Sequence, residues 1–327
     1  MTSAVFDFAT IAGALDQIDT HLGSAVSWHP SGPSQARLLE WRGKLDAEVA
    51  RLRHVDGCAS TDSDELNSYL SERGFAYRFR PLTPPFFGAA SALTEATRWP
   101  APGMSVPVFA AGLDYRGFIL ADQPADGHSL ADGRTLVAMP RRIQDPGYVW
   151  LLLGDRLPDG SDGFELFEAA HAALAARATG ERQRFASVTM PEVRQSGTNE
   201  LEWLRGLTGD GGTTIDQAVQ EAHLRIDRTG SEAAVATAAS TRSAVFGFVR
   251  ALIVDRPFIA FWTDDATLEL PLAVARFDFD TWSRWDPDLA DRENAEIEVA
   301  EEAAREAADT SGGTERHSLL RRLLVRR

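Results

Sequence analysis

Apolar residues recur at helical spacing in several stretches of the chain. Residues 5–22, 36–53 and 163–178 carry apolar side chains three and four positions apart, so that these side chains share one helix face. A shorter stretch of the same kind runs from Asp64 to about Arg73. The pattern therefore predicts amphipathic helices in these four places.

Strand patterns fill much of the remaining sequence. Short apolar or alternating runs end at Gly, Pro or Asp, as strands do where they lead into turns. The predicted strands are 75–80, 115–121, 134–140, 148–153, 257–263 and 267–277. A turn at Asp264–Asp265 separates the last two runs, which predicts a hairpin. Residues 54–64 follow neither pattern and are predicted to form a loop.

One stretch, residues 228–250, fits neither a helix nor a strand pattern. From Gly230 to Ser240 nearly every side chain is small, and no stripe of large apolar residues marks a helix face. Such residues suit an exposed loop, a weak helix or a strand buried on both faces. The residues of the stretch leave these three alternatives open.

The segments on either side of this stretch resemble the serpins, a family of serine protease inhibitors. Residues 219–230 (VQEAHLRIDRTG) are similar to the strand that leads into the hinge of a serpin's reactive-centre loop. Residues 252–259 (LIVDRPFI) are similar to the family's carboxy-terminal signature. The 27 positions from Gly230 to Pro257 are about what a reactive-centre loop needs. Two motifs at the correct separation are more specific than either alone.

Further similarities lie upstream of the loop. Residues 87–99 resemble the central serpin strand that runs to a tryptophan, here Trp99. Residues 184–193 resemble a later strand, and residues 198–207 resemble the helix that follows it in the family. These matches place the resemblance mainly in residues 100–280.

The resemblance implies an α+β, serpin-like fold with mixed multi-stranded sheets, helices packed around them and an exposed reactive-centre loop. The serpin-like domain would cover residues 1–285, in a divergent member of the prokaryotic (bacterial) type. Residues 1–100 are too few for all the helices and strands that a full serpin has there, so this half is shortened and the central sheet is expected to lack strands. Residues 286–327 lie beyond the usual serpin end and are predicted to form a flexible tail, first acidic and then basic.

Composition narrows the range of partners. The chain has 327 residues, of which 44% are apolar and 25% charged, as in ordinary globular proteins. Its net charge of −15 argues against nucleic acid or an anionic membrane as the main partner. Cys58 is the only cysteine, and no Cys/His cluster has metal-ligand spacing, so we expect no internal disulfide, metal or cofactor. No secretory signal or membrane-spanning run is visible, which makes a cytoplasmic location the expectation.

Motifs that mark an enzyme are missing from the sequence. It contains no G-x-S-x-G elbow, no phosphate-binding G-x-x-x-x-G-K, no H-E-x-x-H and no Rossmann fingerprint. The paired acids Asp264–Asp265 and Asp278/Asp280 are interpreted as turn and surface residues. We therefore expect no enzymatic activity.

The resemblance instead implies inhibition by a change of shape. A serine protease cleaves the exposed loop, and the freed segment inserts into a sheet as a new strand that carries the protease with it. The hinge that would insert first comprises Gly230, Ser231, Glu232, Ala233, Ala234, Val235, Ala236 and Thr237. Alternation places Ser231, Ala233 and Val235 on one face, and their small or β-branched side chains could enter a packed sheet without overfilling it.

Three bonds are candidates for cleavage. Counting forward from Gly230 as in other serpins points to Ala244–Val245, and counting back from Pro257 points to Phe246–Gly247. Arg242–Ser243 is the only trypsin-like site in this window. We favour Ala244–Val245, which would suit an elastase- or subtilisin-like protease.

Two other functions compete with inhibition. One is a non-inhibitory, serpin-like scaffold for protein interactions, which the shortened first half favours while the hinge favours inhibition. The other is attachment to a membrane or partner through the basic, amphipathic end, residues 316–327. A solvated tail that contacts the acidic segment before it is the simpler interpretation of this end.

Overall fold

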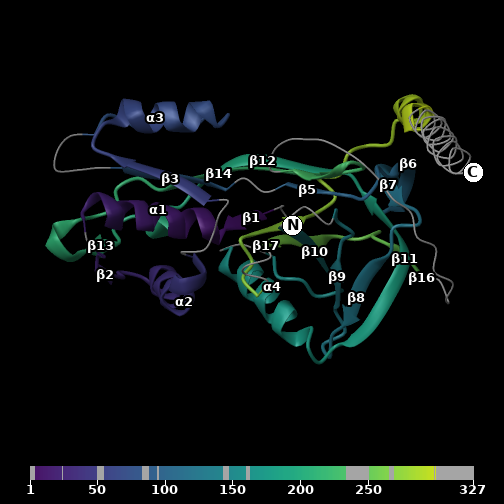
Figure 1. The fold of residues 1–327 in the computed structure, drawn as a ribbon, viewed down its shortest axis with the longest axis horizontal. Coiled ribbons are helices and arrows are strands. Elements are labelled where there is room, and N and C mark those ends of the chain that lie inside the picture. The colour runs from purple at the N-terminus through teal and green to yellow at the C-terminus, as the bar shows by residue number, and fades with distance from the viewer. Residues whose placement is uncertain are drawn as a thin grey trace, which may run out of the picture.

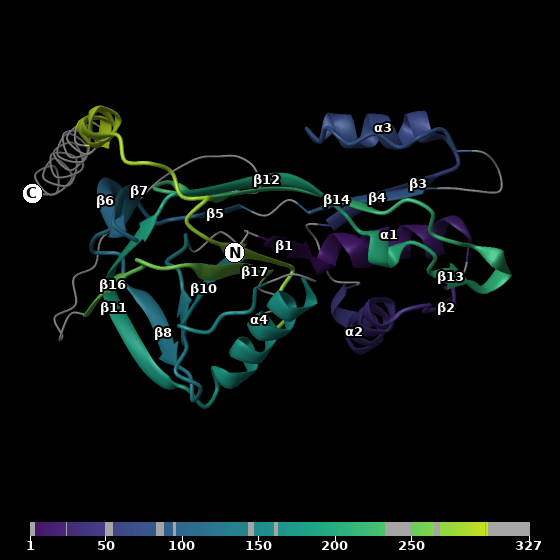
Figure 2. The ribbon, with the colours of Figure 1, turned by 180° about the vertical axis from the view of Figure 1, so that it is seen from behind.

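The chain forms two sheets of unequal size with helices around them. The computed structural model describes residues 4–23, 25–49, 55–82, 88–93, 96–142, 147–159, 163–232, 250–264, 269–297 and 299. The helices are α1 (Phe8–His21), α2 (Pro33–Val49), α3 (Ser63–Glu72) and α4 (Phe164–Ala176), and residues 287–297 are also helical. Short 3-10 turns are η1 (Glu202–Leu204) and η2 (Asp210–Gly212). In both overall views α1, α2 and α3 lie at one end of the molecule and the helix of residues 287–297 lies at the other (Figures 1 and 2).

The larger sheet has ten strands and is mostly antiparallel. Its path is β1 (Ala4–Asp7), β18 (Ala273–Phe277), β17 (Phe258–Asp264), β10 (Gly147–Leu153), β9 (Thr135–Ala138), β8 (Ala125–Ser129), β11 (Glu181–Pro191), β7 (Leu113–Leu120) and β6 (Met104–Ala110). β16 (Arg250–Ile253) joins off this path and pairs in parallel with β11. The predicted hairpin is confirmed, because β17 and β18 pair antiparallel.

Three shorter groups of strands complete the fold. The second sheet has the order β12 (Val193–Glu200), β14 (Val219–Asp227), β15 (Gly230–Glu232) and β5 (Ala96–Arg98). β3 (Val55–Ser60) pairs antiparallel with β4 (Gly88–Leu93), and β2 (Trp28–His29) pairs antiparallel with β13 (Thr208–Gly209). β4 and β5 are consecutive strands, so the chain passes from the β3–β4 pair into the second sheet.

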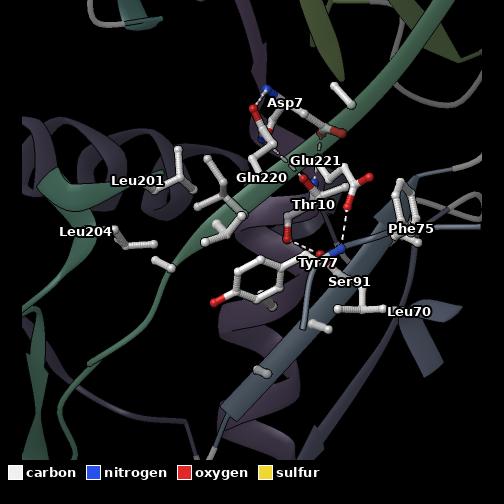
Figure 3. A pocket seen from close by; sticks show the side chains of 18 of the residues that line it. Asp7, Thr10, Leu70, Phe75, Tyr77, Ser91, Leu201, Leu204, Gln220 and Glu221 are labelled. Carbon is white, nitrogen blue, oxygen red and sulfur yellow. Dashed lines mark hydrogen bonds between the residues drawn. The ribbon is translucent and has the colours of Figure 1, made fainter. Parts of the chain in front are cut away.

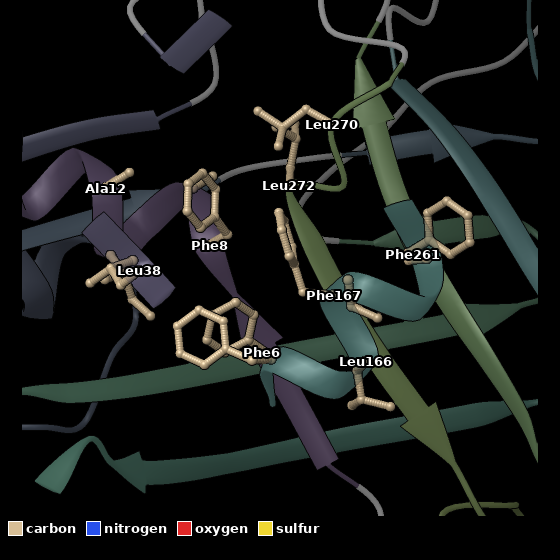
Figure 4. Packing of buried hydrophobic residues seen from close by; sticks show 14 of the residues in the cluster. Phe6, Phe8, Ala12, Leu38, Leu166, Phe167, Phe261, Leu270 and Leu272 are labelled. Carbon is tan, nitrogen blue, oxygen red and sulfur yellow. The ribbon is translucent and has the colours of Figure 1, made fainter. Parts of the chain in front are cut away.

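Alternation along the central strands creates two apolar cores, one on each face of the large sheet. All seven residues of β17 are buried, as expected of a strand covered on both sides. Phe261 belongs to the same core as Phe6, Phe8 and Phe167, which lies beside α1 and α4 (Figure 4). Its neighbour Trp262 points the other way, into the core that the large sheet shares with the second sheet. Strands β12, β14 and β5 therefore pack over this second core.

The first helix begins later than its apolar pattern predicts. A helix was expected over residues 5–22, but residues 4–7 form β1 and pair with β18. Asp7 then ends the strand and caps α1, because its carboxylate accepts a hydrogen bond from the Thr10 amide at 2.9 Å. The predicted helices at 36–53, 64–73 and 163–178 correspond to α2, α3 and α4 within a few residues.

Three other predictions of local structure were wrong. Residues 54–64 were predicted as a loop, but residues 55–60 form β3, since pairing with β4 outweighs their weak strand propensity. Residues 75–80 were predicted as a strand, but they belong to no sheet and instead hydrogen-bond to side chains. Residues 198–207 were predicted as a helix, but β12 continues to Glu200 and only η1 is helical after it.

The described part of the predicted tail is helical. Residues 287–297 form a helix whose side chains contact the body of the protein. Residues 298 and 300–327 lie outside the described part of the chain, so the prediction for the basic end stays a prediction. No helix in the described ranges is long and apolar enough to cross a membrane.

Candidate functional site

The stretch of small residues begins with a short strand, β15, that folds back on β14. The turn between the two strands is Arg228–Thr229. The carboxylate of Asp227 accepts hydrogen bonds from both the amide and the hydroxyl of Thr229, each at 2.7 Å. An aspartate that caps its own turn in this way is a common means of reversing the chain. Asp227 therefore fixes the point where the chain turns back into the sheet.

β15 occupies a position between two other strands. It pairs antiparallel with β14 on one side, with Ser231 opposite Ile226, and with β5 on the other, with Ser231 opposite Thr97. At Gly230 the backbones are so close that a Cβ would lie 2.4 Å from the carbonyl oxygen of Thr97. Glycine is therefore required there for β15 to reach β5.

Two tryptophans hold the start of this hairpin from inside. Ser231 is fully buried, and its hydroxyl accepts a hydrogen bond from the Trp262 indole at 2.8 Å. Trp99, also fully buried, donates its indole N–H to the carbonyl oxygen of Asp227 at 2.8 Å. Because Trp262 belongs to β17, the Ser231 side of β15 faces the core shared with the large sheet.

Below β15 the sheet opens into a cavity of about 570 Å³. β14 and β4 lie on its two sides and are not paired with each other in the described structure. Thr10, Ile11 and Leu15 of α1 line its floor, and Leu201 and Leu204 lie at its far end (Figure 3). The volume is in the range of ligand pockets, and the two facing strands give it the form of a slot.

The segment after α3 covers the outer side of the slot. The carboxylate of Glu221 on β14 accepts hydrogen bonds from the amides of Ala76 and Tyr77, each at 2.9 Å for its closest oxygen (Figure 3). Phe75 stacks on His223 with ring centroids 5.6 Å apart. Tyr77 itself lines the slot. We call residues 75–79 the strap, because they cross from the β3–β4 side to β14.

The polar groups of the slot are mostly tied to backbone. Gln220 on β14 accepts a hydrogen bond from the Asp7 amide at 3.2 Å and donates one to the Asp7 carbonyl oxygen at 2.9 Å. These bonds fix β14 to the point where α1 begins. Ser91 on β4 donates its hydroxyl to the carbonyl oxygen of Thr10. The slot walls are therefore anchored to α1 on both sides.

Two carboxylates of the slot have shifted pKa values in opposite directions. Burial raises the pKa of Asp7 to about 7, and the hydrogen bonds from Thr10 and Ala9 offset this only in part. Burial also acts to raise the pKa of Glu221, but the amides of Ala76 and Tyr77 outweigh it and hold that pKa below its usual value. Asp7 thus carries the titration near neutral pH, while Glu221 stays ionised.

The structure places part of the predicted hinge at the head of this slot. Gly230, Ser231 and Glu232 form β15. The remaining hinge residues, Ala233, Ala234, Val235, Ala236 and Thr237, lie outside the described residues. The candidate cleavage residues Arg242, Ser243, Ala244, Val245, Phe246 and Gly247 also lie outside them. Their roles stay predictions.

Sequence reasoning missed the strap and the residues beneath the slot. The aromatic alternation at Phe75, Tyr77 and Phe79 was interpreted as a strand, although it serves to cover a cavity. Asp7 and Gln220 gave no signal, because a capping aspartate and a strand glutamine are common in many folds. Only the three-dimensional arrangement shows that they meet.

The lone cysteine packs beside the strap, against the cluster of Leu66, Leu70 and Ala90. Cys58 on β3 is half-buried, and burial raises the pKa of its thiol. In the described ranges no three His, Cys, Asp or Glu side chains are grouped so that they could hold a metal ion.

Several solved structures share this fold. Tengpin, a thermophilic serpin in its native state, has a TM-score of 0.53 and 10% identity, over 84% of this chain and 88% of that chain. Human thyroxine-binding globulin in complex with its ligand has a TM-score of 0.50 and 12% identity, over 84% of this chain and 91% of that one. Serpin48 from the insect Tenebrio molitor has a TM-score of 0.48 and 12% identity, over 84% and 91% of the two chains.

The similarity to known proteins is detectable in the fold but not in the sequence comparisons. No protein-family model and no curated protein sequence matches it. At identities of 10–13% the structural similarity concerns the fold alone.

Proposed function

We propose that this chain, which has the serpin fold, inhibits serine proteases by loop cleavage and strand insertion. The observation that supports this most strongly is the position of β15. The strand leaves β14, turns back between β14 and β5, and ends at the mouth of an open slot. After cleavage of the loop, the first residues of the inserting segment, Gly230–Glu232, would already be paired in the sheet.

The register of β15 fits continuation into the slot. A strand extended from Glu232 in the same register would place Ala233 opposite Leu224 and Thr237 opposite Gln220 on β14. Both Leu224 and Gln220 line the slot, whose other side is formed by β4. The extended strand would thus run between β14 and β4, where each strand has an edge on the slot side.

The side chains of the hinge suit this path. Since side chains alternate along a strand, Ala233 and Val235 would face the interior on the same side as Ser231. Ser231 already meets the Trp262 indole there, and the core beneath is filled by large aromatic residues. Ala233 would enter beside this core, where only a compact side chain fits without displacing its neighbours, and the residues after it would enter the cavity.

Insertion would release enough free energy to distort a protease. A strand of about 15 residues spans roughly 50 Å and could make up to about two backbone hydrogen bonds per residue. At about 0.5–1.5 kcal/mol net for each bond, the sum is on the order of 15 kcal/mol or more. This is comparable with the whole stability of a typical domain, about 5–15 kcal/mol. The cleavage sites proposed above would favour an elastase- or subtilisin-like target.

Substitution of Ser231 tests the proposal. Arginine cannot enter the fully buried site beside Trp262, so Ser231→Arg should be cleaved by subtilisin, elastase or trypsin without forming an adduct that is stable on a denaturing gel. The matched control Ser231→Ala keeps a small side chain and should form the adduct as the unmodified protein does. A stable adduct with Ser231→Arg in the same yield would contradict insertion.

A second function keeps the fold but not the inhibition. In this alternative the chain is a non-inhibitory serpin-fold protein that binds a partner or ligand, and thyroxine-binding globulin is a protein of similar fold whose structure was solved with a bound ligand. The observation that favours it is the strap, which covers the slot through Glu221. Clean cleavage of the unmodified protein by all three proteases, with no adduct, would support this alternative.

A further inference from the structure

The helix at residues 287–297 packs against the end of the molecule where β14 turns into β15. Asn294 makes a pair of hydrogen bonds with the backbone of Ser105, accepting from the amide at 2.8 Å and donating to the carbonyl oxygen at 3.0 Å. Ser105 lies on β6, the edge strand of the large sheet, and is buried. The amide side chain thus pairs with a strand edge as another strand would.

Glu293, one residue earlier, is held between two arginines. It forms an ion pair with Arg116 of β7 and lies 3.7 Å from the Nε of Arg228, and the Ser105 hydroxyl donates to it at 2.8 Å. All three charged side chains are largely buried, with 16–18% of their surface exposed. Charges held this far from water interact more strongly than surface pairs do.

Arg228 is one of the two residues of the β14–β15 turn. Its carbonyl oxygen accepts a hydrogen bond from the amide of Gly103 at 2.6 Å. The turn is therefore tied to the start of β6 by backbone and to the helix by Glu293. A second contact, to Glu296 at 3.9 Å, is looser, and the Glu296 side chain is 76% exposed.

Two further ion pairs lie next to Arg116 and the turn. Arg116 also contacts Glu192 at 3.1 Å, so it bridges the two glutamates. Arg225 pairs with Asp227 at 2.5 Å across the base of the turn. Glu293 is the member of the network through which the helix reaches both the sheet edge and the turn.

We propose that residues 287–297 form a latch that holds the Arg228–Thr229 turn and thereby keeps β15 in the sheet. The latch binds the turn in the conformation in which β15 is paired with β14 and β5. It therefore favours this state over one in which residues 230–232 have left the sheet. The second part of the inference rests on the proposed function: a hairpin held in place serves as the nucleus from which insertion proceeds. A latch of this kind couples the segment after β18 to the hinge.

Hydrogen exchange on the full-length, uncleaved protein tests the first part without any protease. Asn294→Ala removes the anchor on Ser105 without touching Arg228, and the amides of residues 290–297 report whether the helix detaches. We expect those amides and the amides of Gly230–Glu232 to exchange faster together, by about tenfold or more. The amides of β10 and β17, in the centre of the large sheet, should be unchanged.

Two further variants sharpen the comparison. Glu293→Gln should accelerate the Gly230–Glu232 amides in the same way, because it leaves both arginines without their shared carboxylate. The matched control Glu296→Gln alters an exposed charge on the same helix and should leave these amides within about twofold of the unmodified protein. Unchanged exchange at Gly230–Glu232 while residues 290–297 have become faster would overturn the latch.

A kinetic measurement separates the latch from the proposed function. After the loop is nicked, insertion can be followed as the gain of thermal stability with time, and Asn294→Ala should slow this gain. If the unmodified protein gains no stability, the proposed function fails while the exchange result on the latch stands. If the unmodified protein gains stability and Asn294→Ala gains it at the same rate, the nucleating role of the latch is wrong.

Discussion

At the scale of single residues, burial decides which groups respond to pH and which positions accept change. Gly230 and Ser231 are fixed by contact, because one allows β15 to approach Thr97 and the other fits beneath Trp262. Asp7 is fixed by a different compromise. Its carboxylate caps α1, but it does so out of reach of water, which raises its pKa to about 7.

The replacement Asp7→Asn should therefore stabilise the protein at alkaline pH. Between pH 3.8 and about 7 the folded state binds the Asp7 proton more tightly than the unfolded state, so this residue lowers stability as the pH rises through that window. Asparagine caps helices equally well and does not ionise. Denaturant unfolding at pH 8 should show a gain of up to about 4 kcal/mol, which vanishes near pH 4. A variant that is less stable than the parent at pH 8 would contradict this assignment.

At the scale of elements, the strap and β14 close the slot together. The carboxylate of Glu221 accepts hydrogen bonds from two amides of the strap and so holds the strap against β14. In the proposed mechanism the new strand would enter beside β14. We expect the strap to obstruct a strand that enters between β14 and β4.

Removal of the carboxylate should loosen the strap. In Glu221→Ala we expect faster hydrogen exchange at Ala76 and Tyr77, since both amides lose their acceptor. The gain of stability after the loop is nicked should also become faster. Glu202→Ala, which changes an exposed glutamate in η1, serves as the control. Slower insertion in Glu221→Ala would mean that the strap guides the entering strand and does not obstruct it.

Some helices and strands could be predicted from the sequence and others could not. Long periodic segments such as 163–178 and apolar strands such as 148–153 were predictable, because their core-facing side chains repeat with the period of the element. β3 was missed because its small and polar residues are held by pairing with β4, a partner about 30 residues away in sequence. The strap was mistaken for a strand because aromatic alternation looks alike over a cavity and in a sheet.

The hinge was the part of the site that local sequence could suggest. The run of mostly small residues from Gly230 indicated a segment able to enter a sheet, and the structure places Gly230, Ser231 and Glu232 in one. The slot itself could not be predicted, since it is formed by α1, β4 and β14 from distant parts of the chain. The contact between Asn294 and Ser105 likewise joins residues 189 positions apart.

At the scale of the whole molecule, a continuous set of contacts connects the helix of residues 287–297 with the two sheets and β15. The large sheet provides Trp262 and the edge strand β6, and the second sheet provides β14, one wall of the slot. The helix after β18 joins β6 to the turn before the predicted hinge. Within the described ranges, the first hundred residues supply three helices, α1 to α3, and five strands, β1 to β5. This part of the chain thus furnishes one wall and the floor of the slot.

The most direct test of the account is the thermal unfolding of the protein before and after a single nick within residues 233–249. Insertion of the freed strand adds on the order of 15 kcal/mol, and for a chain of this size each kcal/mol raises the melting temperature by about 1–3 °C. We expect the nicked protein, with both fragments still associated, to melt about 20 °C or more above the intact one. A nicked protein that melts at the same temperature or lower would contradict strand insertion.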